Sequence, residues 1–184
     1  SSAASDVYKR QNIDRLSKEG IWFTQCYANS FRTDRGTICT FSGYQSFPDL
    51  SVMKIPAKSR TLPSIAGKLA KEGYHTDFLY GGDINFTNMK SYLLESGYQN
   101  LTADTDFPMS QHQNAWGVND DITFDHLYQM IKDRRDSPWH TAFLTLSSHE
   151  PFEVPYHRLK EKQPNAFAFT DHCLGAVSYT HLRA

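Results

Sequence analysis

Three polar clusters in the sequence contain residues that could bind and transfer an anionic group; they lie at residues 30–36, 81–88 and 147–150. The first follows Asn29 in N-S-F-R-T-D-R-G and places Thr33 where a predicted strand turns into a predicted helix. Free backbone amides and the helix dipole at such a turn can hold an anion that is transferred to the threonine oxygen. The alternative is that Thr33 only caps the helix, which is the usual role of a threonine there.

A threonine hydroxyl is a weak nucleophile until a metal ion or a base activates it. Metal coordination is the form of activation that suits a phosphoryl or sulfuryl acceptor. Arg32 and Arg35 flank Thr33 in the sequence. Thr33 is therefore a candidate nucleophile, and Arg35 is a candidate substrate-binding residue beside it.

The third cluster, S-S-H-E-P-F, places His149 just after an apolar run. A histidine there can donate a hydrogen bond to a phosphate oxygen or protonate a leaving alkoxide near neutral pH. A surface or structural histidine is the alternative. In the second cluster, G-G-D-I-N-F-T-N, the paired glycines allow the backbone to approach a ligand closely. Asp83 and Asn85 in this loop could orient a substrate headgroup, and turn formation is the alternative for both.

A further segment, N-A-W-G-V-N-D-D, contains Trp116 and Asp120. Both could line the same pocket as the three clusters. The alternatives are a packed aromatic ring for Trp116 and a helix cap for Asp120. His75, His172 and the acidic face around Asp133 indicate only solvated surface.

The elements that must position these residues alternate between helices and strands. Apolar spacing and stop signals predict helices at 12–20, from Thr33 onward, after a cap at Thr61 up to Gly73, at 89–95 and at 122–134. Asp120 or Asp121 is the expected cap of the last of these. Strands are predicted at 21–28, 74–80 and 141–146, the last as a central strand buried on both faces. This alternation favours an α/β fold with a largely parallel sheet flanked by helices. The clusters would then lie beyond the carboxyl ends of the strands, where ligands gather in such sheets.

The composition limits the function classes. A chain of 184 residues with 39% hydrophobic content can bury the core of one ordinary domain. The formal net charge of -1 predicts no broad attraction to nucleic acid or to an anionic membrane. No stretch approaches the roughly 20 apolar residues that span a bilayer. The cysteines, Cys26, Cys39 and Cys173, form no C-x-x-C pattern and are interpreted as inert thiols.

Both ends of the chain differ from the pattern beside them. Residues 1–11 and 178–184 resemble translated sequencing-adapter read-through and are interpreted as non-native. The expected domain is therefore 12–177, a partial catalytic domain of a protein that extends in both directions.

The runs I-D-R-L-S-K-E-G-I-W-F-T-Q-C-Y-A-N-S and L-A-K-E-G-Y-H-T-D-F-L-Y-G, followed by F-L-T-L-S-S-H-E-P-F, resemble the sulfatases of the alkaline phosphatase superfamily. The sulfatase motif Cys-x-Pro-x-Arg, or its serine form, is absent: Cys39 is followed by T-F-S-G, which favours a small buried helix residue. Thr33 in R-T-D-R-G is similar to the nucleophile of lipoteichoic-acid-synthase-like proteins. This resemblance implies a phospho-threonine intermediate on a divalent metal, Mn or Mg, and transfer to an acceptor alcohol or to water. It also implies that His149 contacts the substrate.

Two departures from that family bear on activity. Thr87 and Met89 stand nearest to the tryptophan and arginine with which lipoteichoic acid synthases grip glycerol phosphate, which argues against glycerol phosphate polymerisation. The family's metal site also needs an acidic residue upstream of Ile13 and a later Asp-His pair, and neither falls within this chain. Catalytic divalent ions need about three or four protein ligands, and Thr33 supplies one oxygen. The expectation is that this chain alone does not bind the metal tightly and is inactive, although its parent is an enzyme.

Three functions are compatible with these residues. The first is a phosphoryl transferase or phosphodiesterase that acts on an envelope or lipid-linked alcohol phosphate, outside the cytoplasmic membrane, with the parent anchored by an upstream segment. The second is a sulfatase that acts on sulfate esters. The third is a noncatalytic module of the same fold that binds carbohydrate or lipid.

Overall fold

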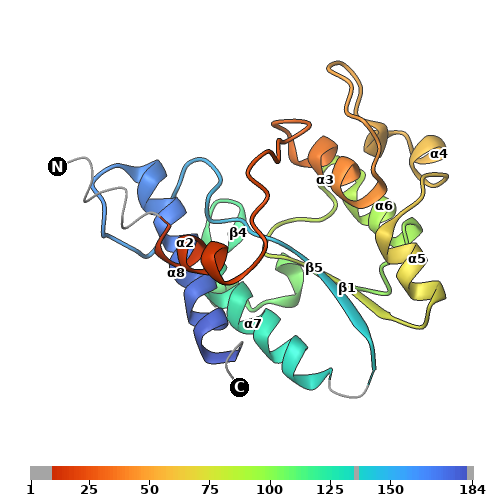
Figure 1. Ribbon diagram of the computed structural model, residues 1–184. Helices are drawn as coiled ribbons and strands as arrows, with labels where there is room; N and C mark the ends of the chain where they lie inside the picture. The colour runs from red at the N-terminus through yellow and green to blue at the C-terminus, as the bar shows by residue number, and fades with distance from the viewer. Residues whose placement is uncertain (1–9, 135–136, 182–184) are drawn as a thin grey trace.

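The computed structural model describes residues 10–134 and 137–181, and its centre is a three-stranded sheet in the order β2-β1-β5 (Figure 1). β1 (His75–Tyr80) pairs in parallel with β2 (Asn100–Thr102) on one side and with β5 (Trp139–Leu144) on the other. Because the strands run in one direction, their carboxyl ends and the loops that follow lie at one edge of the sheet. The expected α/β fold with a parallel sheet flanked by helices is confirmed.

The remaining elements surround this sheet. The α-helices are α2 (Gln11–Glu19), α3 (Thr33–Ser42), α4 (Pro56–Ser59), α5 (Ile65–Lys71), α6 (Met89–Glu95), α7 (Asp120–Asp133) and α8 (Lys162–His181). Single 3-10 turns are η1 (Val52–Lys54), η2 (Phe86–Asn88), η3 (Asp104–Asp106) and η4 (Met109–Gln111). A small antiparallel ribbon pairs β3 (His112–Asn114) with β4 (Gly117–Val118).

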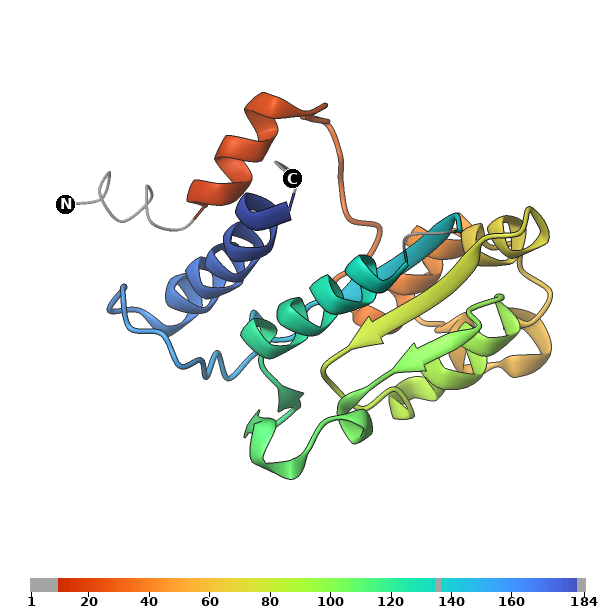
Figure 2. The same ribbon diagram turned by 90° about the horizontal axis from the view of Figure 1, so that it is seen from below.

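Different helices cover the two faces of the sheet, because successive side chains of a strand point to opposite faces. Phe78 of β1 packs into a core with buried residues of α3, α5 and α6, among them Ile38 and Tyr92. Leu79, the next residue, packs with Val118 and with apolar side chains of α7 on the opposite face. α8 packs outside α7, as Figure 2 also shows.

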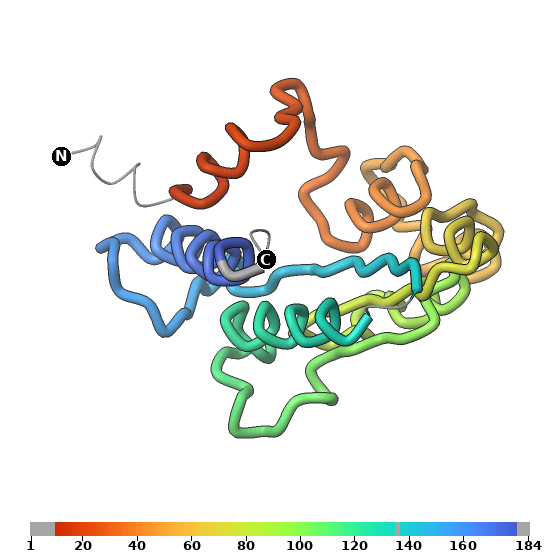
Figure 3. The backbone as a smooth tube through the Cα atoms, turned by 60° about the horizontal axis from the view of Figure 1, so that its bottom comes forward, coloured from red at the N-terminus to blue at the C-terminus, as the bar shows by residue number. Residues whose placement is uncertain are grey.

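α2 and α8 lie side by side (Figure 3). The Asp171 carboxylate of α8 accepts hydrogen bonds from the backbone nitrogens of Asn12 and Ile13, at 3.0 and 2.9 Å. Asp171 thereby caps α2, because Arg10, the N-cap residue of α2, makes no side-chain capping bond. α8 continues past residue 177, and Ser178 accepts a hydrogen bond from Arg15. The proposed domain limits stay predictions, and 1–9 and 182–184 of the suspected ends lie outside the described residues.

The predicted helices at 12–20, from Thr33, at 89–95 and at 122–134, and the strand at 74–80, are confirmed within a residue or two. Gly73 ends α5 with a φ of +86°, as its stop signal predicts. The cysteines are free, as expected, and burial raises the pKa of the Cys173 thiol, so that this thiol stays protonated.

The strand predicted at 21–28 is wrong, because this segment is irregular and forms no ladder. It is an extended connection between α2 and α3 on the outside of the molecule (Figure 2). Its large apolar side chains are exposed, from 55% at Trp22 to 87% at Ile21, and Phe31 just beyond it is 91% exposed. Aromatic and β-branched residues favour a strand only where a neighbouring strand and a core face receive them. No neighbouring strand reaches this segment within the described residues.

Two predicted helix caps are also wrong. α5 begins after Ser64, whose Oγ accepts a hydrogen bond from Gly67 N at 2.9 Å, and not after Thr61, whose hydroxyl donates to Lys58 O. α7 begins after Asn119, so that Asp120 and Asp121 lie within its first turn. In both cases several capping residue types stand close together, and tertiary contacts select one of them.

The strand predicted at 141–146 exists but starts and ends two residues earlier, and it is not central. β5 lies at the edge of the described sheet, and most of its side chains are half-buried. The strand is apolar because its side chains pack against α7 on one face and line the pocket beside α3 along its free edge.

A buried ion pair ties the end of α7 to β1. Asp77 is 1% exposed, and its Oδ1 accepts hydrogen bonds from Arg134 Nη2 at 2.8 Å and from Asn100 Nδ2 at 2.9 Å. A carboxylate in the middle of a buried strand is costly unless donors surround it. Arg134 therefore compensates a charge that β1 cannot expose.

Arg134→Ala should lower the free energy of unfolding by roughly 3 kcal/mol, the lower end of the effect of breaking a buried pair, since Arg134 itself is partly exposed. The matched control is Arg10→Ala, which removes the exposed pair with Asp14 and should cost less than about 1 kcal/mol. Urea unfolding measures both. Equal losses of unfolding free energy in the two variants would contradict the conclusion that the buried Asp77 carboxylate needs Arg134.

His140 should make the protein sensitive to acid. Burial lowers the pKa of His140 from its ordinary 6.5, and Asp77 partly offsets this effect. The unfolded chain therefore binds a proton at a higher pH than the folded one, and stability falls as the pH drops below about 6.5. When the pH is lowered from about 7.5 to about 5.5, the unfolding free energy of His140→Gln should fall less than that of the wild type. Urea titrations at both pH values test this, and parallel losses in the two proteins would refute it.

Candidate active site

Thr33 is the first residue of α3 and does not cap the helix. The N-cap position belongs to Arg32, which has an extended backbone and no side-chain capping bond. The first amides of α3 are thus free of a side-chain cap and can receive an anion. The Thr33 side chain is exposed and has no hydrogen-bond partner among the described residues.

Thr33 lines a pocket of about 400 Å³ along the free edge of β5. The helix contributes Thr33, Gly36, Thr37 and Thr40, whose spacing places them on one face of α3. The sheet contributes Phe78 of β1 and the last two residues of β5, Phe143 and Leu144. The hydroxyl therefore lies on a concave surface near the carboxyl end of a parallel strand.

Arg35 points elsewhere. It lines a small hollow with Ile38, Cys39 and Tyr44 on another face of α3, and its Nε is buried without a hydrogen-bond partner among the described residues. The structure does not bring Arg35 together with Thr33, whereas the neighbouring Arg32 lines the same pocket as Thr33.

His149 and Trp116 lie against each other, and neither lines the pocket beside Thr33. Their ring centroids lie 4.9 Å apart with the planes tilted by 60°. Trp116 Nε1 donates a hydrogen bond to the carbonyl of Glu150 at 2.7 Å, and His149 Nδ1 lies 2.6 Å from the same oxygen. Since a carbonyl oxygen only accepts, Nδ1 carries the proton. Nε2 is then the nitrogen that remains for a ligand.

The loop after β1 packs against the turn that carries Trp116. Val118 N donates a hydrogen bond to Gly81 O at 2.9 Å, and Gly82 bridges Gly117. A Cβ at Gly117 would overlap the Gly81 carbonyl, and Gly117 has a φ of +137° that favours glycine. Paired glycines in this loop allow the ribbon to approach, so they serve a backbone contact.

Asp83 and Asn85 face solvent in this same loop. Asp83 Oδ1 accepts hydrogen bonds from Asn85 N at 2.8 Å and from Asn85 Nδ2 at 3.0 Å, which is a side-chain-stabilised turn. Met89, which the family comparison of the sequence placed near a substrate-gripping position, is buried in the core.

The sequence did not indicate the surroundings of Tyr80 or of Asp120. Tyr80 ends β1 with its ring against Gly82, and burial, together with Asp104 and Asp83, raises the pKa of its hydroxyl. Asp120 is neither a pocket residue nor a cap: it is fully buried beneath the loop that carries His149. No local pattern in the sequence could indicate its partners, because they lie 26 to 50 residues away.

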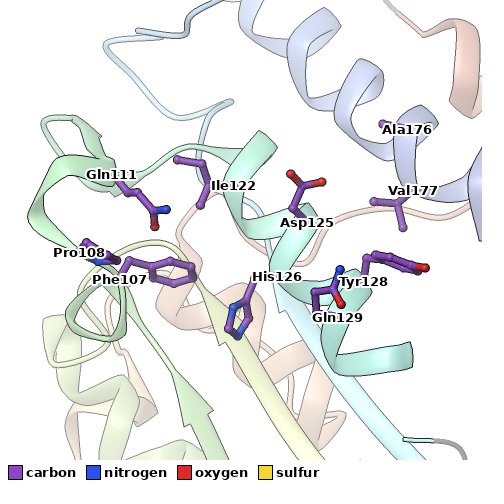
Figure 4. Close-up of a pocket in the computed structure, with 10 residues that line it drawn as sticks. All are labelled: Phe107, Pro108, Gln111, Ile122, Asp125, His126, Tyr128, Gln129, Ala176 and Val177. Carbon is purple, nitrogen blue, oxygen red and sulfur yellow. The ribbon is translucent and has the colours of Figure 1, made fainter. Parts of the chain in front are cut away.

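A separate pocket of about 740 Å³ lies between α7, α8 and the segment around Phe107 (Figure 4). Its lining residues are Phe107, Pro108, Gln111, Ile122, Asp125, His126, Tyr128, Gln129, Ala176 and Val177. None of the residues predicted for chemistry lines it. The strand-end loops remain the better candidate because they gather polar groups at the carboxyl edge of the sheet.

The donor set for a metal ion is incomplete within the described residues. No group of three or more His, Cys, Asp or Glu side chains there could hold a cation, and Thr33 offers a single oxygen. These residues alone do not fit a metal centre. Across residues 10–134 and 137–181, we also find no helix with the length and apolar character of a membrane span.

Comparisons with known proteins agree with this arrangement of sheet and strand-end loops. The family model described as Sulfatase matches residues 2–180, and the chain belongs to the sulfatase family. Among solved structures, it is similar to a protein of the alkaline phosphatase superfamily from Vibrio parahaemolyticus, with 28% identity and a TM-score of 0.85 over 96% of this chain and 45% of that one. It also has the fold of the lipoteichoic acid synthase LtaP from Listeria monocytogenes, with 14% identity and a TM-score of 0.85 over 94% of this chain and 46% of that one. The chain thus spans less than half the length of either structure.

Two glycine-to-alanine substitutions should change the stability in opposite directions, and they test the contact between the glycine loop and the Trp116 turn. Gly117→Ala should destabilise the protein by about 1 to 3 kcal/mol, because alanine at this φ is strained and its methyl group meets Gly81. Gly36→Ala, in α3 with open space around it, should instead stabilise by about 1 kcal/mol. Thermal unfolding compares the two variants, and destabilisation of equal size would show that the Gly117 contact is not special.

Proposed function

We propose that this chain is part of a phosphoryl transferase or phosphodiesterase that acts on an envelope or lipid-linked alcohol phosphate through a phosphorylated Thr33. The observation that carries the proposal is the place of Thr33: an exposed hydroxyl at the uncapped start of α3, on the rim of a pocket beside the end of β5. An anionic ester in that pocket would meet free amides and the positive end of the helix dipole.

The proposed reaction has two steps. The Thr33 oxygen gives up its proton and forms a bond to phosphorus while the bond to the leaving alcohol breaks, and the departing alkoxide takes up a proton. Water or an acceptor alcohol then loses a proton as it attacks the phospho-threonine, and the Thr33 oxygen leaves and is protonated again. When both of its ring nitrogens carry protons, His149 supplies a hydrogen bond or a proton from Nε2, since its Nδ1 donates to Glu150 O. Trp116, Asp83 and Asn85 form the proposed substrate-facing wall, and Arg35 remains a weaker substrate-binding proposal because it lies on another face of α3.

The proposal includes a divalent metal, with Mn or Mg favoured by the resemblance to lipoteichoic-acid-synthase-like proteins. Such an ion would supply Lewis-acid activation of the hydroxyl. Thr33 is its proposed ligand in this chain, and the other ligands would come from outside the described residues. This 184-residue chain by itself is therefore proposed to be inactive.

The runner-up is a sulfatase, which the matched family description favours. The local sequence argues against it. Cys39, the only cysteine near the start of α3, lies in the middle of the helix without the proline and arginine of the sulfatase motif. We place the parent enzyme outside the cytoplasmic membrane by likeness to the synthase fold, and an anchor in the parent is part of this proposal.

Thr33→Ala should reduce phosphodiester turnover by at least about a thousandfold in the longer protein that contains this chain, assayed with added Mn or Mg, because it removes the attacking oxygen. Thr40→Ala is the matched control: it removes a hydroxyl from the same helix face and pocket, and turnover should stay within a few-fold of the wild type. Peptide mass spectrometry of the trapped wild-type enzyme should find phosphate on Thr33.

Other results would change the assignment. Retained turnover in Thr33→Ala, or phosphate on another residue, would reject Thr33 as the nucleophile. Turnover of sulfate esters alone would favour the sulfatase. Binding of an envelope ligand without any turnover in the longer protein would favour a noncatalytic module.

A further inference from the structure

The two aromatic residues of the site are held by adjacent buried residues at the start of α7. Asn119 and Asp120 are 1% and 0% exposed, and neither touches solvent or the pocket beside Thr33. A fully buried carboxylate persists only where donors satisfy it. The identity of those donors indicates what Asp120 does.

Asp120 binds the loop that carries His149. Its Oδ1 accepts hydrogen bonds from Leu146 N at 2.8 Å and from Ser147 N at 3.1 Å. Its own backbone nitrogen donates to Ser147 Oγ at 2.8 Å. Three bonds thus fix the backbone that runs from the end of β5 toward His149.

The second oxygen of Asp120 extends this hold to Ser148, the residue before His149. Thr170 Oγ1 of α8 donates to Asp120 Oδ2 at 2.6 Å, and Thr170 Oγ1 and Ser148 Oγ lie 2.9 Å apart. Since the single hydroxyl proton of Thr170 goes to the carboxylate, Ser148 must donate to Thr170. The direction of each bond in the chain from Ser148 to Asp120 is therefore set by the charge.

Asn119 holds the Trp116 turn in a similar way. Asn114 Nδ2 donates to Asn119 Oδ1, and Asn114 Oδ1 accepts from Trp116 N at 2.7 Å and from Gly117 N at 3.1 Å. The Glu150 carbonyl then joins the two parts, because Trp116 Nε1 and His149 Nδ1 both bond to it.

We propose that Asp120 is a positioning residue: through Leu146, Ser147 and the Thr170–Ser148 link, it orients His149 against Trp116. This rests on the proposed function for its catalytic meaning, but not for its geometry. Asp120 touches no substrate, and it acts by fixing the side-chain nitrogen that His149 presents. Catalytic geometry of this kind requires support from the residues behind the reacting groups.

The test measures the His149 ring itself and requires no turnover. In this chain the ring current of the Trp116 indole should shift the NMR signals of the His149 ring protons, since the rings are 4.9 Å apart. His149→Gln assigns these signals among the eight histidines, and Trp116→Leu should abolish the shift. A change that only lowers stability does not move the signals of the folded state.

Asp120→Asn should move the His149 signals at least halfway toward those of a free histidine, because an amide cannot accept at both of its ends. Asp121→Asn is the matched control. It removes the same charge from the same helix turn, and the His149 signals should not move. Thr170→Val should give a partial shift that Thr170→Ser restores, and this pair decides the question if Asp120→Asn does not fold.

Unchanged His149 signals in folded Asp120→Asn, or in folded Thr170→Val if the first variant does not fold, would overturn the proposal, as would an equal movement in Asp121→Asn. In the longer protein, Asp120→Asn should lower kcat by roughly tenfold or more with little change in KM. Failure of the Thr33 proposal would appear as turnover that survives Thr33→Ala, while the NMR result for Asp120 would stand independently.

Discussion

The parallel pairing of β1 with β5 is the constraint on which the other features depend. Its register, from His75 opposite Trp139 to Tyr80 opposite Leu144, brings both strands to their carboxyl ends together. The glycine loop and the His149 loop therefore leave the sheet at one edge, and the Trp116 ribbon bridges them. The pocket beside Thr33 uses the last residues of β5 as its wall. A shift of β5 by one residue would exchange its two faces and separate all of these contacts.

Three buried carboxylates accept hydrogen bonds from distant segments. Asp171 caps α2 from α8, Asp120 accepts two amides from the end of β5, and Asp77 accepts Arg134 and Asn100. Each carboxylate joins segments that lie far apart in the sequence. Its hydrogen bonds fix the orientation of these segments, because hydrogen bonds are directional and apolar contacts are not. The polar network around Asp120 is nearly complete, and complete networks of this kind fix one arrangement of the groups that they join.

The sequence predicts elements whose signals are local, and it does not predict those that depend on partners. The helix at Met89–Glu95 and the strand at His75–Tyr80 follow from apolar spacing and from the glycines that end them. The cap at Ser64 could not be separated from Thr61 by type, since both carry a hydroxyl. The segment 21–28 has the composition of a strand but no neighbouring strand among the described residues. The place of Thr33 at the start of a helix could be predicted because it is a local property, whereas the contacts of Asp120 depend on Leu146 and Thr170, which only the fold brings near.

The unpaired edge of β5 bears on where the missing metal ligands of the proposed enzyme would lie. On the other side of the sheet centre, β2 occupies the second edge of β1, and α7 covers one face of β5. The free edge of β5 is where the Thr33 pocket opens, and the exposed apolar run that leads into α3 ends at Phe31 on the same pocket. In the proposed enzyme, the ligands that complete a site with Thr33 would come from segments beside this edge. In parallel sheets, such ligands lie at the carboxyl ends of the strands. The direction of β5 thus bears both on where the proposed nucleophile lies and on the side from which its proposed partners would come.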